Sequence, residues 1–196
     1  MNVSSTSKDP NINDSKSKIG FNAGVFANFP LSSKFTIQPE LLYTQYGNKT
    51  TFTTTNQNTP GYTVSGKNTG STSLDYIALP VMFQYKATPQ FYLEAGPEFG
   101  LLINAKNKYD LNVTYTPTSG PVTTTSTSGT SDVKDNINSF NLGLGAGAGY
   151  YFTPNIGITA RYVAGVTKIN KYHIANSSDN VINSVFQVGL AYKFAK

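Results

Sequence analysis

Five charged residues that alternate with apolar residues are the first candidates for chemistry. They are Glu40, Glu94, Glu98, Arg161 and Lys193. Glu94 and Glu98 are four residues apart, roughly 13 Å along a strand, which is wider than the roughly 5–9.5 Å between paired glycosidase carboxylates. Buried charges persist only when they are paired and hydrogen-bonded. We therefore expect a structural charge network inside the fold, with an Arg161–carboxylate pair at its centre and Gln38, Gln84 and Gln187 satisfying the remaining groups.

No other residue pattern predicts catalysis, a cofactor or a metal. His173 is the single histidine and there is no cysteine, so neither a catalytic triad nor a zinc site can be assembled. The glycines from Gly143 to Gly149 alternate strictly, without the Lys-Ser/Thr and following helix of a phosphate-binding loop. The net charge is +5, but the lysines are scattered through Thr/Asn/Ser-rich segments, which argues against nucleic acid. We expect a non-enzymatic protein.

The elements that must position the five charged residues are strands. Apolar residues alternate with Gly, Asn, Gln and Thr at a period of two, most clearly from Ile156 to Val166, and this period is that of a half-buried strand. Seven full strands are predicted, at residues 19–29, 35–46, 75–86, 91–105, 140–152, 156–166 and 185–194. Prolines 39, 80 and 97 fall inside them, and we expect β-bulges there.

The connections between these strands alternate in length. Tight turns are predicted at 30–34, 88–90 and 153–155, and long polar loops at 47–73, 106–138 and 168–183. Short turns on one side and long loops on the other are typical of outer-membrane barrels. The expected fold is all-β, an eight-stranded antiparallel up-and-down transmembrane β-barrel forming a single domain over residues 1–196.

The number of strands is odd, which predicts that the first strand is largely missing from this chain. Residues 1–17 are expected to hold the remnant of that strand and the first long loop, with the seven full strands in 18–194. A sheet of seven strands would leave an open edge, which lipid does not tolerate.

The two faces of each strand differ in composition, and this sets the orientation. One face is apolar, so a soluble lipocalin-like barrel that binds a ligand inside is an alternative. The other face carries Gly, Asn, Gln and Thr with isolated charges, whereas a water-facing surface is usually rich in Lys and Glu. Small polar residues suit the crowded interior of eight strands. We therefore expect the apolar face to meet lipid, and the interior charges to form a plug or, alternatively, a narrow ion path.

Several sequence blocks resemble a known family. They are Lys34-Phe-Thr-Ile-Gln-Pro-Glu-Leu-Leu-Tyr43, Leu74-Asp-Tyr-Ile-Ala-Leu-Pro80, Tyr92-Leu-Glu-Ala-Gly-Pro-Glu-Phe-Gly100 and Phe186-Gln-Val-Gly-Leu-Ala-Tyr-Lys-Phe194. In order and spacing they resemble the PorT-like outer-membrane β-barrel family of Bacteroidetes. The resemblance implies a barrel of OmpA/OmpX size, a cleaved signal peptide and a bacterial outer-membrane location. Some relatives are linked to protein secretion, so a link to secretion is also implied.

The leading functional hypothesis is a rigid membrane anchor whose long loops meet the outside. The expected partners are the lipid bilayer and, through the loops, a protein; a monomer is expected. A narrow porin-like channel and the soluble ligand-binding barrel are the alternatives.

Overall fold

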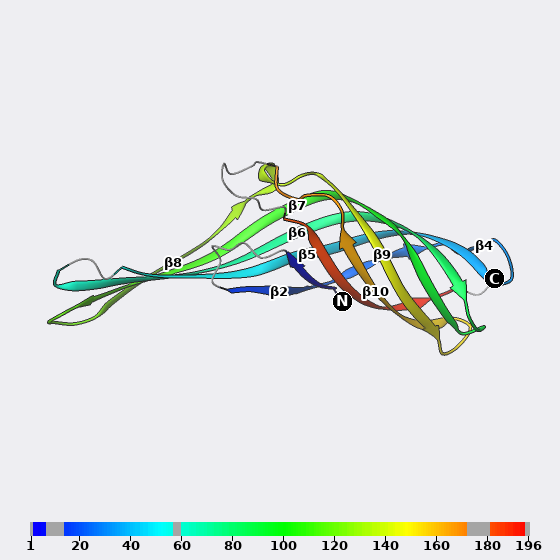
Figure 1. The fold of residues 1–196 in the computed structure, drawn as a ribbon, viewed down its shortest axis with the longest axis horizontal. Helices are drawn as coiled ribbons and strands as arrows, with labels where there is room; N and C mark the ends of the chain where they lie inside the picture. Colours follow the sequence, from blue (N-terminus) through cyan, green and yellow to red (C-terminus); the bar gives the residue numbers. More distant parts are fainter. Residues whose placement is uncertain (1, 7–13, 57–59, 172–180, 195–196) are drawn as a thin grey trace.

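The protein consists almost entirely of β-structure. The computed structural model describes residues 2–6, 14–56, 60–171 and 181–194. One antiparallel sheet contains eleven strands in this part of the chain (Figure 1). They are β1 (Asn2–Thr6), β2 (Asp14–Gly20), β3 (Asn22–Phe26), β4 (Phe29–Pro30), β5 (Phe35–Asn56), β6 (Tyr62–Lys86), β7 (Phe91–Pro117), β8 (Thr123–Asp132), β9 (Phe140–Tyr151), β10 (Ile156–Gly165) and β11 (Asn183–Tyr192).

The single described helix is the short 3-10 turn η1 (Lys134–Asn136). Within the described residues, no helix has the length and apolar character needed to cross a membrane.

The strands follow one another around a curved wall. The order is β2-β1-β11-β10-β9-β7-β6-β5-β3, with β8 paired to the outer part of β7 and β4 paired to β5. β2, β3 and β4 pair in succession with β5, while β2 also pairs with β1. The wall curves around an interior at the right of Figure 1.

The sheet is not closed along its whole length. β1 pairs with Asn183–Gln187 of β11 on one side and with Lys18–Gly20 of β2 on the other. Beyond this point, residues 188–192 of β11 pair only with β10, and β3 pairs only with β5, among the described strands. A closed wall of eight strands, as expected from the sequence, is therefore not what the described residues form.

Three strands continue far beyond their predicted ends. β5, β6 and β7 contain 22, 25 and 27 residues, and with β8 they form a long extension at the left of Figure 1. The predicted loops 47–73 and 106–138 were therefore wrong over much of their length. The physical reason is composition: threonine, valine and tyrosine fit a pleated strand well, and Thr-rich repeats can pair with one another as readily as they can form a loop.

The prolines do not cause the predicted bulges. Pro39 pairs with Val81 and Pro80 with Glu98 in the same register as the pairs on either side of them. Pro97 pairs with Leu144 in an unbroken ladder. A proline removes one donor without adding a residue, so pairs are missing beside Pro39 and Pro80 but the register is kept. The register shift in the β6–β7 ladder lies elsewhere, between Asp75 and Tyr76.

The three predicted tight turns are confirmed, and they share one hydrogen-bond pattern. In each, a Ser or Thr hydroxyl accepts a hydrogen bond from the backbone N–H three residues later. The pairs are Ser32 with Phe35 at 3.1 Å, Thr88 with Phe91 at 2.9 Å and Thr153 with Ile156 at 2.9 Å. Local side-chain bonds of this kind favour turns, which explains why sequence located them well.

Candidate functional site

The candidate site begins with a row of residues that lie side by side across the wall. Gln84 pairs with Glu94, Glu94 with Gly147, Gly147 with Arg161, and Arg161 with Gln187. Directly opposite residues share one face of a sheet, and the four polar side chains of this row are buried. The alternation that the sequence predicts therefore places one cation and one carboxylate on the inner face, two strands apart.

Gly147 lies between Arg161 and Glu94, and its missing side chain makes their contact possible. A Cβ atom there would lie 2.5 Å from the Ala160 carbonyl oxygen and 3.0 Å from Arg161 Cα. Gly145 leaves room for the same side chain, since a Cβ atom added there would lie 2.9 Å from Met82 Cε and 3.4 Å from Arg161 Cδ. The Gly-rich face of β9 thus provides room for the arginine side chain.

Arg161 holds two carboxylates at once. Its Nη2 and Nη1 donate to the two oxygens of Glu40 at 2.6 and 3.2 Å, and its Nε donates to Glu94 Oε1 at 2.8 Å. The exposed fractions of Arg161, Glu40 and Glu94 are 5, 8 and 4%. Bidentate hydrogen bonds between arginine and a carboxylate are among the strongest in proteins. They offset part of the free-energy cost of removing these charges from water.

Amide side chains satisfy the remaining oxygens of this pair of carboxylates. Gln38 Nε2 donates to Glu40 Oε1 at 2.9 Å, and Gln84 Nε2 donates to Glu94 Oε2 at 3.1 Å and to Gln38 Oε1 at 3.0 Å. Asn28 Nδ2 donates to the same Gln38 oxygen at 2.5 Å. Sequence reasoning did not single out Asn28, although it lies on the polar face of its predicted strand.

Glu98 lies in a second group toward the long-loop end of the wall. It is 1% exposed, and it accepts a hydrogen bond from the Tyr46 hydroxyl. Gln187 Nε2 donates to the same hydroxyl at 3.4 Å. Tyr46, the last residue of the predicted strand 35–46, was also missed. Its signal was its position: it is an even number of residues from Gln38 and Glu40, and so shares their face.

Lys193 lies apart from the carboxylates. Its ammonium group is 3.7 Å from the centre of the Tyr151 ring, which is a cation–π contact. The cation that pairs with Glu40 and Glu94 is Arg161. The structure thus brings together Glu40, Glu94 and Arg161, places Glu98 beside Tyr46, and gives Lys193 an aromatic rather than an acidic neighbour.

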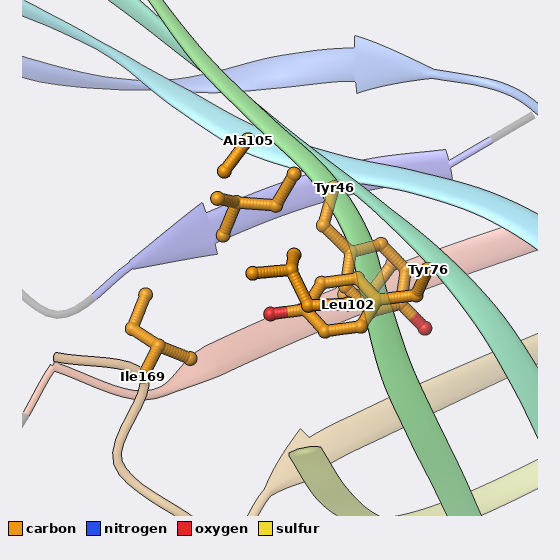
Figure 2. Close-up of a cluster of buried hydrophobic side chains, with 7 residues drawn as sticks. Tyr46, Tyr76, Leu102, Ala105 and Ile169 are labelled. Atoms are coloured by element: carbon orange, nitrogen blue, oxygen red, sulfur yellow. The ribbon is translucent and has the colours of Figure 1, made fainter. Parts of the chain in front are cut away.

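An apolar cluster adjoins the charge network on the long-loop side. It consists of Tyr46, Leu74, Tyr76, Leu102, Ala105, Ile169 and Val185, all buried (Figure 2). Val133, Ile137 and Val181, which lie outside the strands, pack against it. Tyr46 belongs to both groups, since its hydroxyl bonds Glu98 while its ring packs on Tyr76 with centroids 5.4 Å apart.

A cavity of about 750 Å³ reaches the network from the side of the wall. It lies between the edges of β3 and β11 that have no described partner, and Gln38, Glu40 and Arg161 line its inner end. The apolar cluster therefore covers the network on the long-loop side, and the cavity reaches the network through the gap between β3 and β11.

The arrangement offers no reactive constellation in the described part of the chain. No group of three His, Asp or Glu side chains there could hold a metal. His173, the single histidine of the sequence, lies outside the described residues. Arg161 is tied to two carboxylates by three hydrogen bonds, and these bonds hold the three side chains together.

Comparison with known proteins gives a family. Residues 1–171 match the family described as outer membrane protein beta-barrel domain, and no curated protein matches the chain. Solved structures that are similar include Ail, the attachment invasion locus protein of Yersinia pestis, with 14% identity, coverage of 98% of this chain and 97% of that one, and a TM-score of 0.32. The NanC porin is 12% identical, with coverage of 98% and 99% and a TM-score of 0.28. Because the family match spans most of its residues, this chain belongs to the family of outer-membrane proteins with a β-barrel domain.

Proposed function

We propose that this protein is a non-enzymatic anchor in the outer membrane, with a plugged interior and an external sheet that meets other molecules. The observation that carries the proposal is the clamp of Arg161 on Glu40 and Glu94 at 2.6 and 2.8 Å. Side chains fill the interior of a barrel of about eight strands. Each charged group of this cluster is already hydrogen-bonded to a partner of opposite charge, so a passing ion would have to displace that partner.

The apolar cluster supports the same proposal. Residues such as Leu74, Leu102 and Ile169 pack against one another directly beside Glu98 and Tyr46. A hydrophobic constriction next to a filled polar layer opposes the entry of water and ions. The two layers together favour an anchor over a pore.

Conductance in planar bilayers tests the plug. We expect the inserted protein to give no steady single-channel openings, with insertion verified in parallel by protection of the strands from protease. Steady openings whose conductance changes in an Arg161→Ala variant would overturn the plug, because they would place Arg161 on the ion path.

A narrow channel is the second candidate function. The observation that favours it is the lateral cavity of about 750 Å³, which reaches Arg161 and Glu40 from the gap between β3 and β11. A channel of this kind predicts openings in the same bilayer experiment, so one measurement separates the two functions.

We also propose that the complete wall holds eight strands, with one strand filling the whole space between β11 and β3. β1 already lies in this space, antiparallel to β11 and β2, and its line continues past Val188–Tyr192 and Asn22–Phe26. A strand in that line would find backbone partners on both sides, as every backbone group in lipid needs.

The external partner is proposed from the extension of β5, β6, β7 and β8. Its sheet carries mostly Thr, Ser and Asn side chains, which present hydroxyl and amide groups to the outside. Membership of the PorT-like group, the cleaved signal peptide, the link to secretion and the monomeric state stay predictions from the sequence.

A further inference from the structure

The outer face of the wall changes its chemistry in a fixed order toward the extension. On β7, Leu101 and Ile103 are exposed apolar residues on this face, with exposed fractions of 56 and 40%. Past the register shift between Asp75 and Tyr76, the next exposed residues on this face of β7 are Lys106 and Lys108. The apolar band that meets lipid therefore ends, and lysines begin, within a few residues of one strand.

The register places three lysines in one row across neighbouring strands. Lys16 of β2 lies opposite Lys49 of β5, Lys49 lies opposite Ser71 of β6, and Ser71 lies opposite Lys108 of β7. Thr130 of β8 completes the row. Directly opposite residues share a face, so three ammonium groups and two hydroxyls are presented together. Like charges placed opposite one another destabilise a sheet, and a bound anion reduces this repulsion.

The row lies on the side of the wall that faces away from the interior. Lys106 and Lys108 alternate with Ala105, Asn107 and Tyr109, and Ala105 is 0% exposed within the apolar cluster. Lys16, Lys49 and Lys108 are all exposed. The lysine row therefore belongs to the same outer face as Leu101 and Ile103.

The height of the row above the apolar band matches lipid headgroups. Lys106 and Lys108 follow Ile103 by three and five residues, roughly 10 and 17 Å along a strand, and strands of such barrels tilt by about 35–45°. The headgroup layer on each side of a bilayer is roughly 5–8 Å thick. Lysine side chains reach several ångströms back toward the membrane by snorkelling, which brings the row to the level of the phosphates.

Acidic residues occupy other positions on this face. Asp132 lies opposite Lys106. Asp14 lies opposite Thr51 and Asp110 lies opposite Thr69, both one row farther out than Lys16, Lys49 and Lys108. The Asp75 carboxylate, on the membrane side, accepts hydrogen bonds from Gln45 and Asn104 at 3.0 and 2.8 Å. The row of Lys16, Lys49 and Lys108 itself contains only lysines and hydroxyl residues.

We infer that Lys16, Lys49 and Lys108 form a binding site for the phosphate of a lipid headgroup, at the rim of the wall where the extension begins. The ammonium groups supply charge, and Ser71 and Thr130 supply hydroxyl donors. The acyl chains of the same lipid lie against the apolar face that contains Leu101 and Ile103. This site goes beyond anchoring, since it selects lipids that carry a phosphate accessible to the lysine row.

Native mass spectrometry of the full chain in neutral detergent tests the site, with phosphatidic acid as the probe. We expect phosphatidic acid to bind in preference to a neutral diacylglycerol of the same chain length. A variant with Lys16→Gln, Lys49→Gln and Lys108→Gln is expected to lose affinity at least roughly tenfold, since each basic residue near a membrane surface contributes to the attraction of anionic lipid.

The matched control carries Lys34→Gln, Lys134→Gln and Lys171→Gln, which are also exposed and remove the same charge. We expect less than a twofold change in this control. Equal losses in both variants, or no loss in the row variant, would overturn the site. Displacement of the lipid by an equal concentration of inorganic phosphate would overturn the assignment to a lipid. Compact migration of both variants on an unheated denaturing gel shows that they are folded.

Discussion

Replacing Arg161 with alanine is expected to destabilise the folded protein by about 3–5 kcal/mol, the typical cost of removing one partner from a buried ion pair. The substitution leaves Glu40 and Glu94 buried, with exposed fractions of 8 and 4%, and without their cation. Equilibrium unfolding by urea in lipid vesicles measures the change as a lower midpoint with an unchanged slope.

Two further variants decide whether the clamp is the cause. Lys34→Ala removes an exposed cation at a short turn and should leave the midpoint unchanged within about 0.5 kcal/mol. Adding Glu40→Gln and Glu94→Gln to Arg161→Ala removes the uncompensated charges and should recover a large part of the loss. If Arg161→Ala unfolds at the same urea concentration as the natural protein, the charge network does not stabilise the interior.

Placing an arginine at Leu144 is expected to destabilise the protein by about 2–4 kcal/mol in a bilayer, as for charges near the midplane on the lipid face of a barrel. Leu144 lies within β9, opposite Pro97 of β7, and is 59% exposed on the apolar face. The physical reason is that an exposed side chain here meets hydrocarbon rather than water. Urea unfolding in vesicles again gives the free energy.

Val122 provides a matched control for this substitution. It is also 59% exposed, but it lies in the turn between β7 and β8 at the end of the extension. Val122→Arg should change the free energy of unfolding by less than about 0.5 kcal/mol. Equal effects of the two substitutions would mean that both side chains meet the same solvent, which contradicts a lipid-facing wall.

Sequence predicted the barrel-forming half of each long strand well, because alternation is a strong local signal there. The segments 75–86 and 91–105 coincide with parts of β6 and β7, and the segment 156–166 exceeds β10 by one residue. Beyond these segments, composition did not distinguish strands from loops, because Thr-rich stretches suit both. The pairing of such stretches depends on the neighbouring strand, which a single segment does not reveal.

The sequence predicted which charged residues lie on the inner face, but it did not predict which of them contact one another. The alternation placed Glu40, Glu94, Glu98 and Arg161 on the inner face, but it does not show which residues of different strands lie opposite one another. Register decides that Gly147 separates Glu94 from Arg161 and that Glu98 lies beside Tyr46. Lys193 lies near the end of the chain, where the ring of Tyr151 is its neighbour.

The orientation of the wall in lipid is tested most directly by labelling β10 at single positions in vesicles. The chain contains no cysteine, so each introduced cysteine carries the only nitroxide label. Ile158 and Tyr162 are 39 and 50% exposed on the outer face, and Val163 is 2% exposed on the inner face. We expect labels at 158 and 162 to be relaxed by oxygen, which dissolves in hydrocarbon, and the label at 163 to be shielded from both oxygen and a water-soluble nickel complex. Stronger relaxation of the outer labels by the nickel complex than by oxygen would contradict an outer face that meets lipid.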